Sequence, residues 1–153
     1  MDIRTEQYIR DLDNIDKIIN SIDDEEIKSL LLKLFCVRLS GLVELYLKNR
    51  ISDYSKGKVP KEINRYLTVK FKDITNLKTN KLCEILSNFS VQWADDFKNY
   101  VDLHEQTKTS LDSLIAQRHN IAHGQPSTIN QSSMNQYYAD IKNIINYLDS
   151  IIK

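Results

Sequence analysis

The sequence predicts an all-α protein, a helical bundle of five or six helices, on three observations. Apolar residues recur at steps of three and four along most of the chain, which is the period of an amphipathic helix. Only three Gly and two Pro occur in 153 residues, so few positions force a helix to stop. Hydrophobic residues make up 41% of the chain and charged residues 27%, which is typical of a globular domain with an ordinary core. We therefore expect residues 1–153 to form a single domain.

The first part of the chain predicts two long helices. Residues 4–22 carry an apolar stripe with acidic residues on the other faces, which predicts one amphipathic helix. Asp23 followed by Glu26 resembles a capping box and predicts the start of a second helix, which continues to about Ile51. Its broad apolar surface is typical of the central helix of a bundle. Gly41 lies within it, where glycine is costly unless a neighbouring backbone comes close, so we expect a helix crossing there.

A short helix and a loop are expected next. Gly57 ends the second helix, and Pro60 suits the first turn of a short helix that extends to about Tyr66. Val69 and Phe71 then alternate with lysines, which is the pattern of a strand or of an extended loop. A single strand would have no partner in this chain, so we discount the strand.

Helical periodicity returns in the rest of the chain. Gly124 and Pro126 form a typical C-terminal stop, which separates the last two helices. No internal repeat or low-complexity linker interrupts these segments. The expected helices cover residues 74–101, 107–123 and 128–152.

Composition and charge exclude several classes of protein. The 21 Lys and Arg residues balance 21 Asp and Glu residues, which excludes a uniformly basic nucleic-acid coat. No apolar run approaches the roughly 18 residues of a membrane span, and the segment from Met1 to Glu6 is too polar for the start of a signal peptide. We therefore expect a cytoplasmic protein with no membrane partner. Cys36 and Cys83 have no CxxC partner, so we expect two buried free thiols.

The balanced total conceals two charged segments of opposite sign. Residues 1–26 hold three basic and nine acidic residues, a net charge of −6, whereas residues 48–72 hold eight basic and two acidic residues, a net charge of +6. The basic segment is either a solvated surface or an RNA-backbone track, because Tyr54, Tyr66 and Phe71 are interleaved with it. Under the second interpretation, the cations expected to bind RNA are Lys56, Lys58, Lys61, Arg65, Lys70 and Lys72.

One position of the penultimate helix interrupts its apolar stripe. Arg118 stands where the stripe through Leu111, Leu114 and Ile121 predicts an aliphatic side chain. A buried cation without a partner is costly. Arg118 is therefore paired with an internal carboxylate, extended from the edge of the core, or directed into a cleft that receives an anion. Glu44 on the central helix is a candidate internal partner.

Two histidines follow Arg118 at a spacing of four residues. His119 and His123 share one helix face, and Asp112 lies on nearly the same stripe. Zinc would need further ligands with support around them, and only His104 and scattered carboxylates are available, so we expect no metal site. His119 and Asp112 are then solvated surface residues. His123, at the helix end, is suited to proton transfer near neutral pH.

The penultimate helix ends in the segment Arg118-His119-Asn120-Ile121-Ala122-His123-Gly124. This segment resembles the Rx4-6H motif of the HEPN superfamily, in which Arg is followed by a polar residue and then by His near a helix end. The segment Arg38-Leu39-Ser40-Gly41-Leu42-Val43-Glu44 is similar to the early helix of ligase-associated and stand-alone bacterial HEPN families. The resemblance covers about residues 27–153.

The resemblance implies a small helical bundle, commonly a homodimer, that acts as a metal-independent endoribonuclease without a cofactor. Such proteins belong to toxin-antitoxin, phage-defence or RNA-processing systems. The resemblance also implies that Arg118 and His123 are catalytic and that residues of two protomers meet across a cleft. RNA is the implied substrate, and an antitoxin such as a nucleotidyltransferase is an implied partner.

The residue types suit RNA cleavage by a ribose 2′-hydroxyl. His123 would act as general base or acid, and the Arg118 guanidinium would hold the phosphate oxygens. Asn120 or His119 would orient the phosphate or the ribose. Glu44 would orient Arg118 or His123, unless it forms a simple core ion pair.

The geometry of the motif points to a dimer, and the function has one alternative. Arg118 and His123 point about 140° apart on an ideal helix, so one helix does not place both on one phosphate, and a composite dimer site would relieve this separation. The alternative function is a HEPN-like helical bundle that does not cleave RNA and serves as a binding module or faces an antitoxin.

Overall fold

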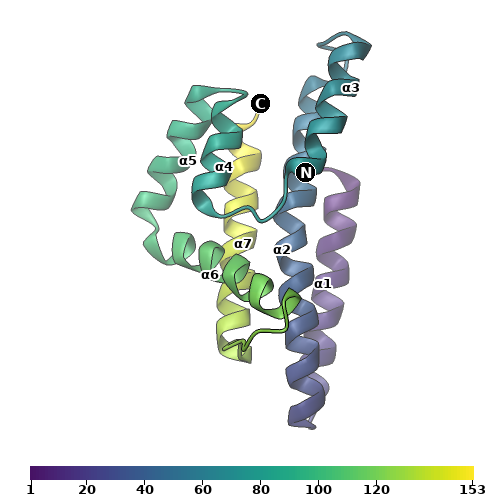
Figure 1. Ribbon diagram of the computed structural model, residues 1–153, viewed down its shortest axis with the longest axis vertical. Helices are drawn as coiled ribbons and strands as arrows, with labels where there is room; N and C mark the ends of the chain where they lie inside the picture. The colour runs from purple at the N-terminus through teal and green to yellow at the C-terminus, as the bar shows by residue number, and fades with distance from the viewer.

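The computed structural model describes residues 1–153 and confirms an all-α fold without strands. Figure 1 shows α1, α2 and α7 along the long axis of the molecule, while α6 runs obliquely across α7 towards α2. The helices are α1 (Ile3–Ser21), α2 (Glu25–Ser55), α3 (Lys61–Lys70), the 3-10 helix η1 (Phe71–Asp73), α4 (Thr79–Ser87), α5 (Val91–Leu103), α6 (Glu105–Ala122) and α7 (Gln131–Ile151).

The predicted count of five or six helices was wrong, because the segment 74–101, expected as one helix, contains a linker at 74–78 followed by two helices, α4 and α5. α4 ends at Ser87, and Ser90 begins α5 by accepting a hydrogen bond from the backbone N–H of Trp93 (3.4 Å). Serine is a favoured residue at this capping position. The break was hidden because the apolar period continues across it: the buried residues are Leu82, Leu86, Trp93, Phe97 and Val101.

Two further local predictions were wrong. The segment expected as an extended loop continues α3 to Lys70 and then forms η1. No residue of α3 is buried, so its sequence need not show the apolar period of a packed helix. The cap of α2 is Asp24 instead of Asp23, and its carboxylate accepts hydrogen bonds from the backbone N–H groups of Glu26 (3.0 Å) and Ile27 (2.9 Å).

The helix crossing at Gly41 is confirmed. The Tyr8 hydroxyl of α1 donates a hydrogen bond to the carbonyl oxygen of Arg38 (2.8 Å). A Cβ atom added to Gly41 would lie 3.0 Å from the same hydroxyl oxygen, closer than side chains normally approach. The missing side chain of Gly41 therefore allows α1 to pack directly against the backbone of α2.

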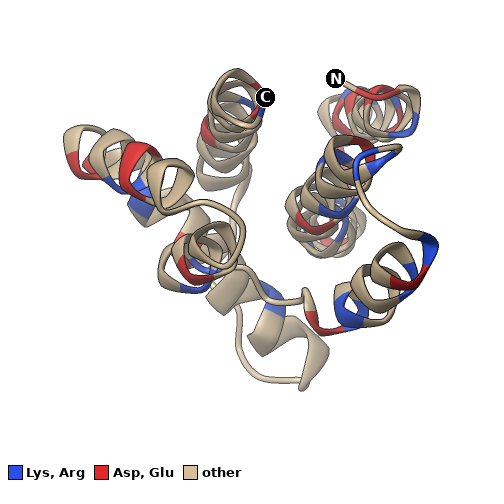
Figure 2. Cartoon of the chain, turned by 90° about the horizontal axis from the view of Figure 1, so that it is seen from above, with Lys and Arg blue, Asp and Glu red and all other residues tan.

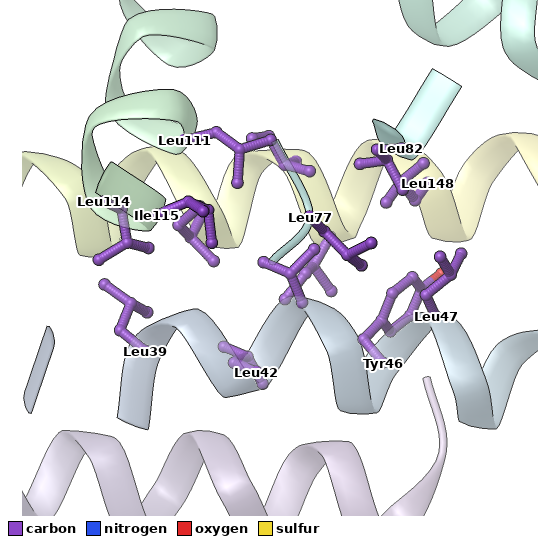
Figure 3. Packing of buried hydrophobic residues seen from close by; sticks show 14 of the residues in the cluster. Leu39, Leu42, Tyr46, Leu47, Leu77, Leu82, Leu111, Leu114, Ile115 and Leu148 are labelled. Atoms are coloured by element: carbon purple, nitrogen blue, oxygen red, sulfur yellow. The ribbon is translucent and has the colours of Figure 1, made fainter. Parts of the chain in front are cut away.

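The core lies between α2, α6 and α7. Figure 3 shows Leu39 and Leu42 of α2 facing Leu114 and Ile115 of α6. Leu77, from the linker between η1 and α4, is also fully buried in this cluster. Burial of such apolar side chains is the main favourable term in folding, so both α6 and the linker are held firmly against α2.

The apolar surface of α2 is only partly covered, unlike the central helix that its pattern predicts. Its middle and C-terminal parts are buried, but large apolar side chains near its N-terminus are between 38% and 61% exposed. They form a stripe on one face of the helix. The members of this stripe are Ile27, Leu30, Leu34 and Val37.

The two cysteines are free, as expected, but differ in burial. Cys36 is buried beside α6, and burial raises its thiol pKa to about 12. Cys83 is only half-buried, which corrects the expectation for that residue. Neither thiol takes part in the site described below.

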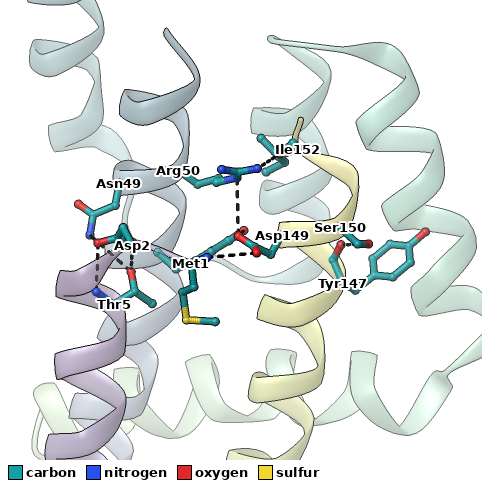
Figure 4. A network of polar contacts seen from close by, with 10 residues as sticks. Met1, Asp2, Thr5, Asn49, Arg50, Tyr147, Asp149, Ser150 and Ile152 are labelled. Atoms are coloured by element: carbon teal, nitrogen blue, oxygen red, sulfur yellow. Dashed lines mark hydrogen bonds and ion pairs between the residues drawn. The ribbon is translucent and has the colours of Figure 1, made fainter. Parts of the chain in front are cut away.

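A polar network joins the ends of α1, α2 and α7 (Figure 4). The Asp149 carboxylate lies 3.4 Å from the Met1 amino group and 3.7 Å from Nε of Arg50. It also accepts a hydrogen bond from the buried Tyr46 hydroxyl (3.2 Å), and burial together with this carboxylate raises the pKa of Tyr46.

None of the helices combines the length and the apolar character needed to cross a lipid bilayer.

Candidate functional site

The predicted motif lies on the last turn of α6. His123 caps the helix, and Gly124 follows with φ +66°. The N–H of Gly124 donates to the Ile121 carbonyl (3.3 Å), and the N–H of Gln125 donates to the Asn120 carbonyl (2.8 Å). This is the hydrogen-bond pattern of a glycine-terminated helix end. It confirms the predicted stop and exposes the side chain of His123.

Arg118 is half-buried, and a neutral side chain holds its guanidinium. Its Nη1 donates a hydrogen bond to Oδ1 of Asn76 (2.9 Å), in the linker before α4. Glu44 is not a direct ion-pair partner, because its carboxylate accepts the backbone N–H of Asn76 instead (2.8 Å). The two residues are therefore connected through Asn76, and the charge of Arg118 is not neutralised by a carboxylate.

Asn76 has an unusual backbone conformation, with φ 53°. It is the only residue other than glycine with a positive φ in the chain. Asparagine tolerates this left-handed conformation better than most residues. The buried side chains of Ile74 and Leu77 flank it, and the Lys81 ammonium donates to the Thr75 carbonyl (2.7 Å). These contacts fix the linker that presents Asn76 to Arg118.

Sequence reasoning missed Asn76 because the whole segment was assigned to a helix. The signal that was available is a cluster of polar residues that favour turns, Thr75 and Asn76 before Thr79 and Asn80. Thr79 begins α4, and its N–H donates to the carboxylate of Asp112 on α6 (2.7 Å). Asp112 was predicted to be a solvated surface residue and instead ties the start of α4 to α6.

The two histidines of the motif lie side by side on the surface. The ring centroids of His119 and His123 are 4.3 Å apart, and both side chains are exposed. No group of three or more His, Cys, Asp or Glu side chains in the chain is placed to hold a metal ion. The rings are accessible to a ligand from outside the bundle.

A groove of about 390 Å³ opens beside the motif. His119 and Asn120 line it from α6, and Asn76 and Lys78 line it from the linker. Arg118 contacts the Asn76 side chain at its edge. Neither Arg118 nor His123 lines this groove. One chain therefore brings together Arg118, Asn76, His119 and Asn120, while His123 lies one turn beyond His119.

This groove combines features that suit an anionic ligand. Lys78 supplies positive charge from the lining, and Arg118 supplies it from next to the lining, where it is bonded to Asn76. Asn76 and Asn120 supply amide groups that donate and accept hydrogen bonds. Arginine recognises phosphate oxygens through its planar fork of donors. The arrangement can therefore hold a phosphate group close to an exposed imidazole.

The basic segment lies away from this groove, around α3. In Figure 2, blue positions gather along α3 and the loop before it. All six predicted cations are exposed, and none forms an ion pair in the chain. They occupy the end of α2 and the loop (Lys56, Lys58), α3 (Lys61, Arg65, Lys70) and η1 (Lys72). The linker that carries Asn76 begins directly after η1. Because Asn76 accepts a hydrogen bond from Arg118, this linker connects the basic segment to the motif.

Comparison with known protein families gives one match over nearly the whole chain. The family model described as RiboL-PSP-HEPN matches residues 3–153. The comparisons with curated proteins and with solved structures found no match.

Proposed function

The chain belongs to the RiboL-PSP-HEPN family of the HEPN superfamily, and from that membership we propose that it is a metal-independent endoribonuclease. HEPN proteins are typically ribonucleases, and HEPN domains commonly dimerise and bind RNA. The observation that carries the proposal is the state of Arg118. The residue is half-buried, and its guanidinium is positioned by Asn76 and free of any carboxylate partner, so several of its five donors remain for phosphate oxygens.

The reaction uses the 2′-hydroxyl of RNA as its nucleophile. O2′ attacks the adjacent phosphorus, the P–O5′ bond breaks, and the products are a 2′,3′-cyclic phosphate and a free 5′-hydroxyl. The proton of the 2′-hydroxyl passes to a base, and O5′ takes up a proton as it leaves. His123 acts as general base or acid, while Arg118 stabilises the charge that develops on the phosphorane.

A homodimer with composite sites supports this chemistry better than one chain alone. Neither Arg118 nor His123 lines the groove beside the motif, and of the two only Arg118 is tied to it, through Asn76. The two side chains are expected to point about 140° apart on one helix. In a two-fold dimer, His123 of one protomer completes the site around Arg118 of the other. Asn120 and His119 orient the phosphate or the ribose, and Glu44 acts through Asn76 to orient Arg118.

The exposed cations around α3 form the RNA-binding track of this proposal. Their charge is not neutralised within the chain, so binding should weaken as salt rises. The cellular role that we propose is that of a toxin or phage-defence nuclease. Its activity would be restrained by an antitoxin such as a nucleotidyltransferase.

The test is cleavage of RNA by the purified full-length chain in excess chelator. We expect cleavage to continue and the products to carry a 2′,3′-cyclic phosphate. A matched substrate with a single 2′-deoxyribose at the cleaved position should be inert there, because it lacks the nucleophile. Loss of cleavage in chelator, or cleavage of the deoxy substrate at the same bond, would contradict the mechanism.

The alternative is a helical module that binds a partner protein without cleaving RNA. One observation favours it, the exposed apolar stripe of Ile27, Leu30, Leu34 and Val37 on α2, because large exposed apolar patches often mark interaction sites. The same assay separates the two. A chain that cleaves no RNA, either with or without chelator, supports the alternative.

Asn76 gives a test of how Arg118 is positioned. Asn76→Gly keeps the left-handed backbone but removes the oxygen that holds Arg118. We expect kcat to fall by about tenfold, since small misplacement of a catalytic group is costly, while thermal unfolding stays close to that of the wild type. The control is Asn99→Ala, at an exposed position of α5. A normal kcat in Asn76→Gly would show that Arg118 does not depend on this contact.

A further inference from the structure

A second groove lies between α3, η1 and α4, separate from the groove beside the motif. Its volume is about 570 Å³, within the range of small-ligand sites. Three aromatic side chains line it, Tyr66 from α3, Phe71 from η1 and Phe89 from the turn after α4. Tyr66 is 58% exposed and Phe89 is 37% exposed, and the Lys70 ammonium lies 5.8 Å from the centroid of the Tyr66 ring. Both side chains are accessible to a flat partner, and Lys70 is close enough to contact it.

The charges in this groove balance. Lys70 and Lys81 face it together with Asp73 and Glu84. Lys81 is already engaged, since it donates to the Thr75 carbonyl (2.7 Å). The interior therefore does not favour a phosphate, which would meet two carboxylates. It favours a neutral, flat group that carries hydrogen-bond donors, because a carboxylate only accepts.

The surroundings of the groove are cationic. Arg65 and Lys72 are exposed next to it and form no ion pairs. A neutral interior beside a basic exterior matches a polymer with anionic phosphates and neutral bases. Single-stranded nucleic acid has this structure, and its bases stack on exposed aromatic rings.

The linker connects this groove to the motif. Ile74 lines the aromatic groove, and Asn76, two residues on, lines the groove beside α6 and holds Arg118. Two residues span at most about 7 Å of backbone. The lining of the aromatic groove therefore comes within two residues of the side chain that holds Arg118. On this basis we expect one RNA strand to contact both.

We propose that the groove between α3 and α4 binds one unpaired nucleobase of the RNA substrate, near the bond that is cleaved. This inference rests on the proposed ribonuclease function. Tyr66 and Phe89 stack on the base, and the carboxylates of Asp73 and Glu84 accept hydrogen bonds from its amino group. Cytosine, adenine and guanine carry such a group, whereas uracil offers only its N3–H and presents the acceptor O4 to the carboxylates. The groove therefore prefers the first three bases over uracil.

The test measures binding apart from cleavage, in the full-length Arg118→Ala background. Fluorescence anisotropy with labelled hexamers of C or of U gives the Kd. We expect C to bind more tightly than U, and Tyr66→Ala and Phe89→Ala each to raise the Kd for C by about tenfold, as for other stacking residues. Tyr66→Phe should retain binding, because the ring remains. The control is Val91→Ala, which removes a side chain that is 69% exposed and does not line the groove.

A second pair of variants examines the base preference. Asp73→Asn and Glu84→Gln replace the carboxylates with amides of the same size, which can also donate to the O4 of uracil. We expect the preference for C over U to shrink in the double variant. Unchanged Kd values in the alanine variants, or a groove that binds a second copy or another protein in place of RNA, would overturn the inference.

Failure of this inference can be distinguished from failure of the proposed function. If the wild type cleaves RNA in chelator while the groove variants bind normally, only the base site is wrong. If the wild type cleaves no RNA while Tyr66→Ala and Phe89→Ala still weaken binding of the C hexamer, the base site holds and the nuclease assignment fails.

Discussion

Arg118→Ala is expected to lower kcat for RNA cleavage by about 10²- to 10³-fold, the usual cost of removing one preorganised group that stabilises transition-state charge. Arg118 is half-buried, and Asn76 fixes the position of its guanidinium. Little reorganisation is needed when charge develops on the phosphorane. The alanine variant loses both the charge and the directed donors.

The conservative variant Arg118→Lys separates these two contributions. Lysine keeps the charge but presents a compact ammonium on a flexible stem, without the planar fork. We expect it to recover only a small part of the lost kcat, while the KM for RNA stays close to that of the wild type. The control is Arg10→Ala on α1, where the side chain is exposed and bonds only to neighbouring residues of the same helix. Near-normal kcat in Arg118→Ala would remove Arg118 from the site.

The parts of the site that could be predicted from the sequence are those that depend on local order. Arg118 and His123 are separated by one helical turn and a half, and the Gly124 stop follows directly, so a short window contains them all. The all-α class also follows from local periodicity. The position of Asn76 could not be predicted from the sequence. Its backbone conformation depends on the burial of Leu77 and on a contact with Glu44, which is 32 residues away in the chain.

The same reasoning explains the errors in the helices. The break between α4 and α5 does not disturb the spacing of buried residues, so the apolar pattern does not reveal it. It is marked by the cap at Ser90, whose side chain accepts one hydrogen bond. α3 buries no residue although Ile63, Tyr66 and Leu67 give it an apolar side, so the sequence pattern does not show where this helix ends. The structure adds that α3 forms one wall of a groove.

His123→Ala is expected to reduce kcat by about 10²- to 10⁴-fold, the range for loss of a general acid or base. Two other histidines serve as controls of different kinds. His104→Ala removes an imidazole at the start of α6, where it bonds to the Tyr100 carbonyl (2.8 Å), and should leave kcat unchanged. His119→Ala removes a side chain that lines the groove beside the motif, and we expect a smaller loss that falls mainly on KM.

Mixing two inactive variants tests whether the site is composite. Arg118→Ala and His123→Ala are each inactive alone, but a heterodimer of the two has one site with both side chains intact, if Arg118 and His123 come from different protomers. Random exchange makes half of the dimers mixed, and one of their two sites is intact, so activity should return to about a quarter of the wild-type value. If both side chains act within one chain, every site in the mixture lacks either the Arg118 or the His123 side chain. No activity would then return, and the composite dimer would be excluded while the two residues kept their roles.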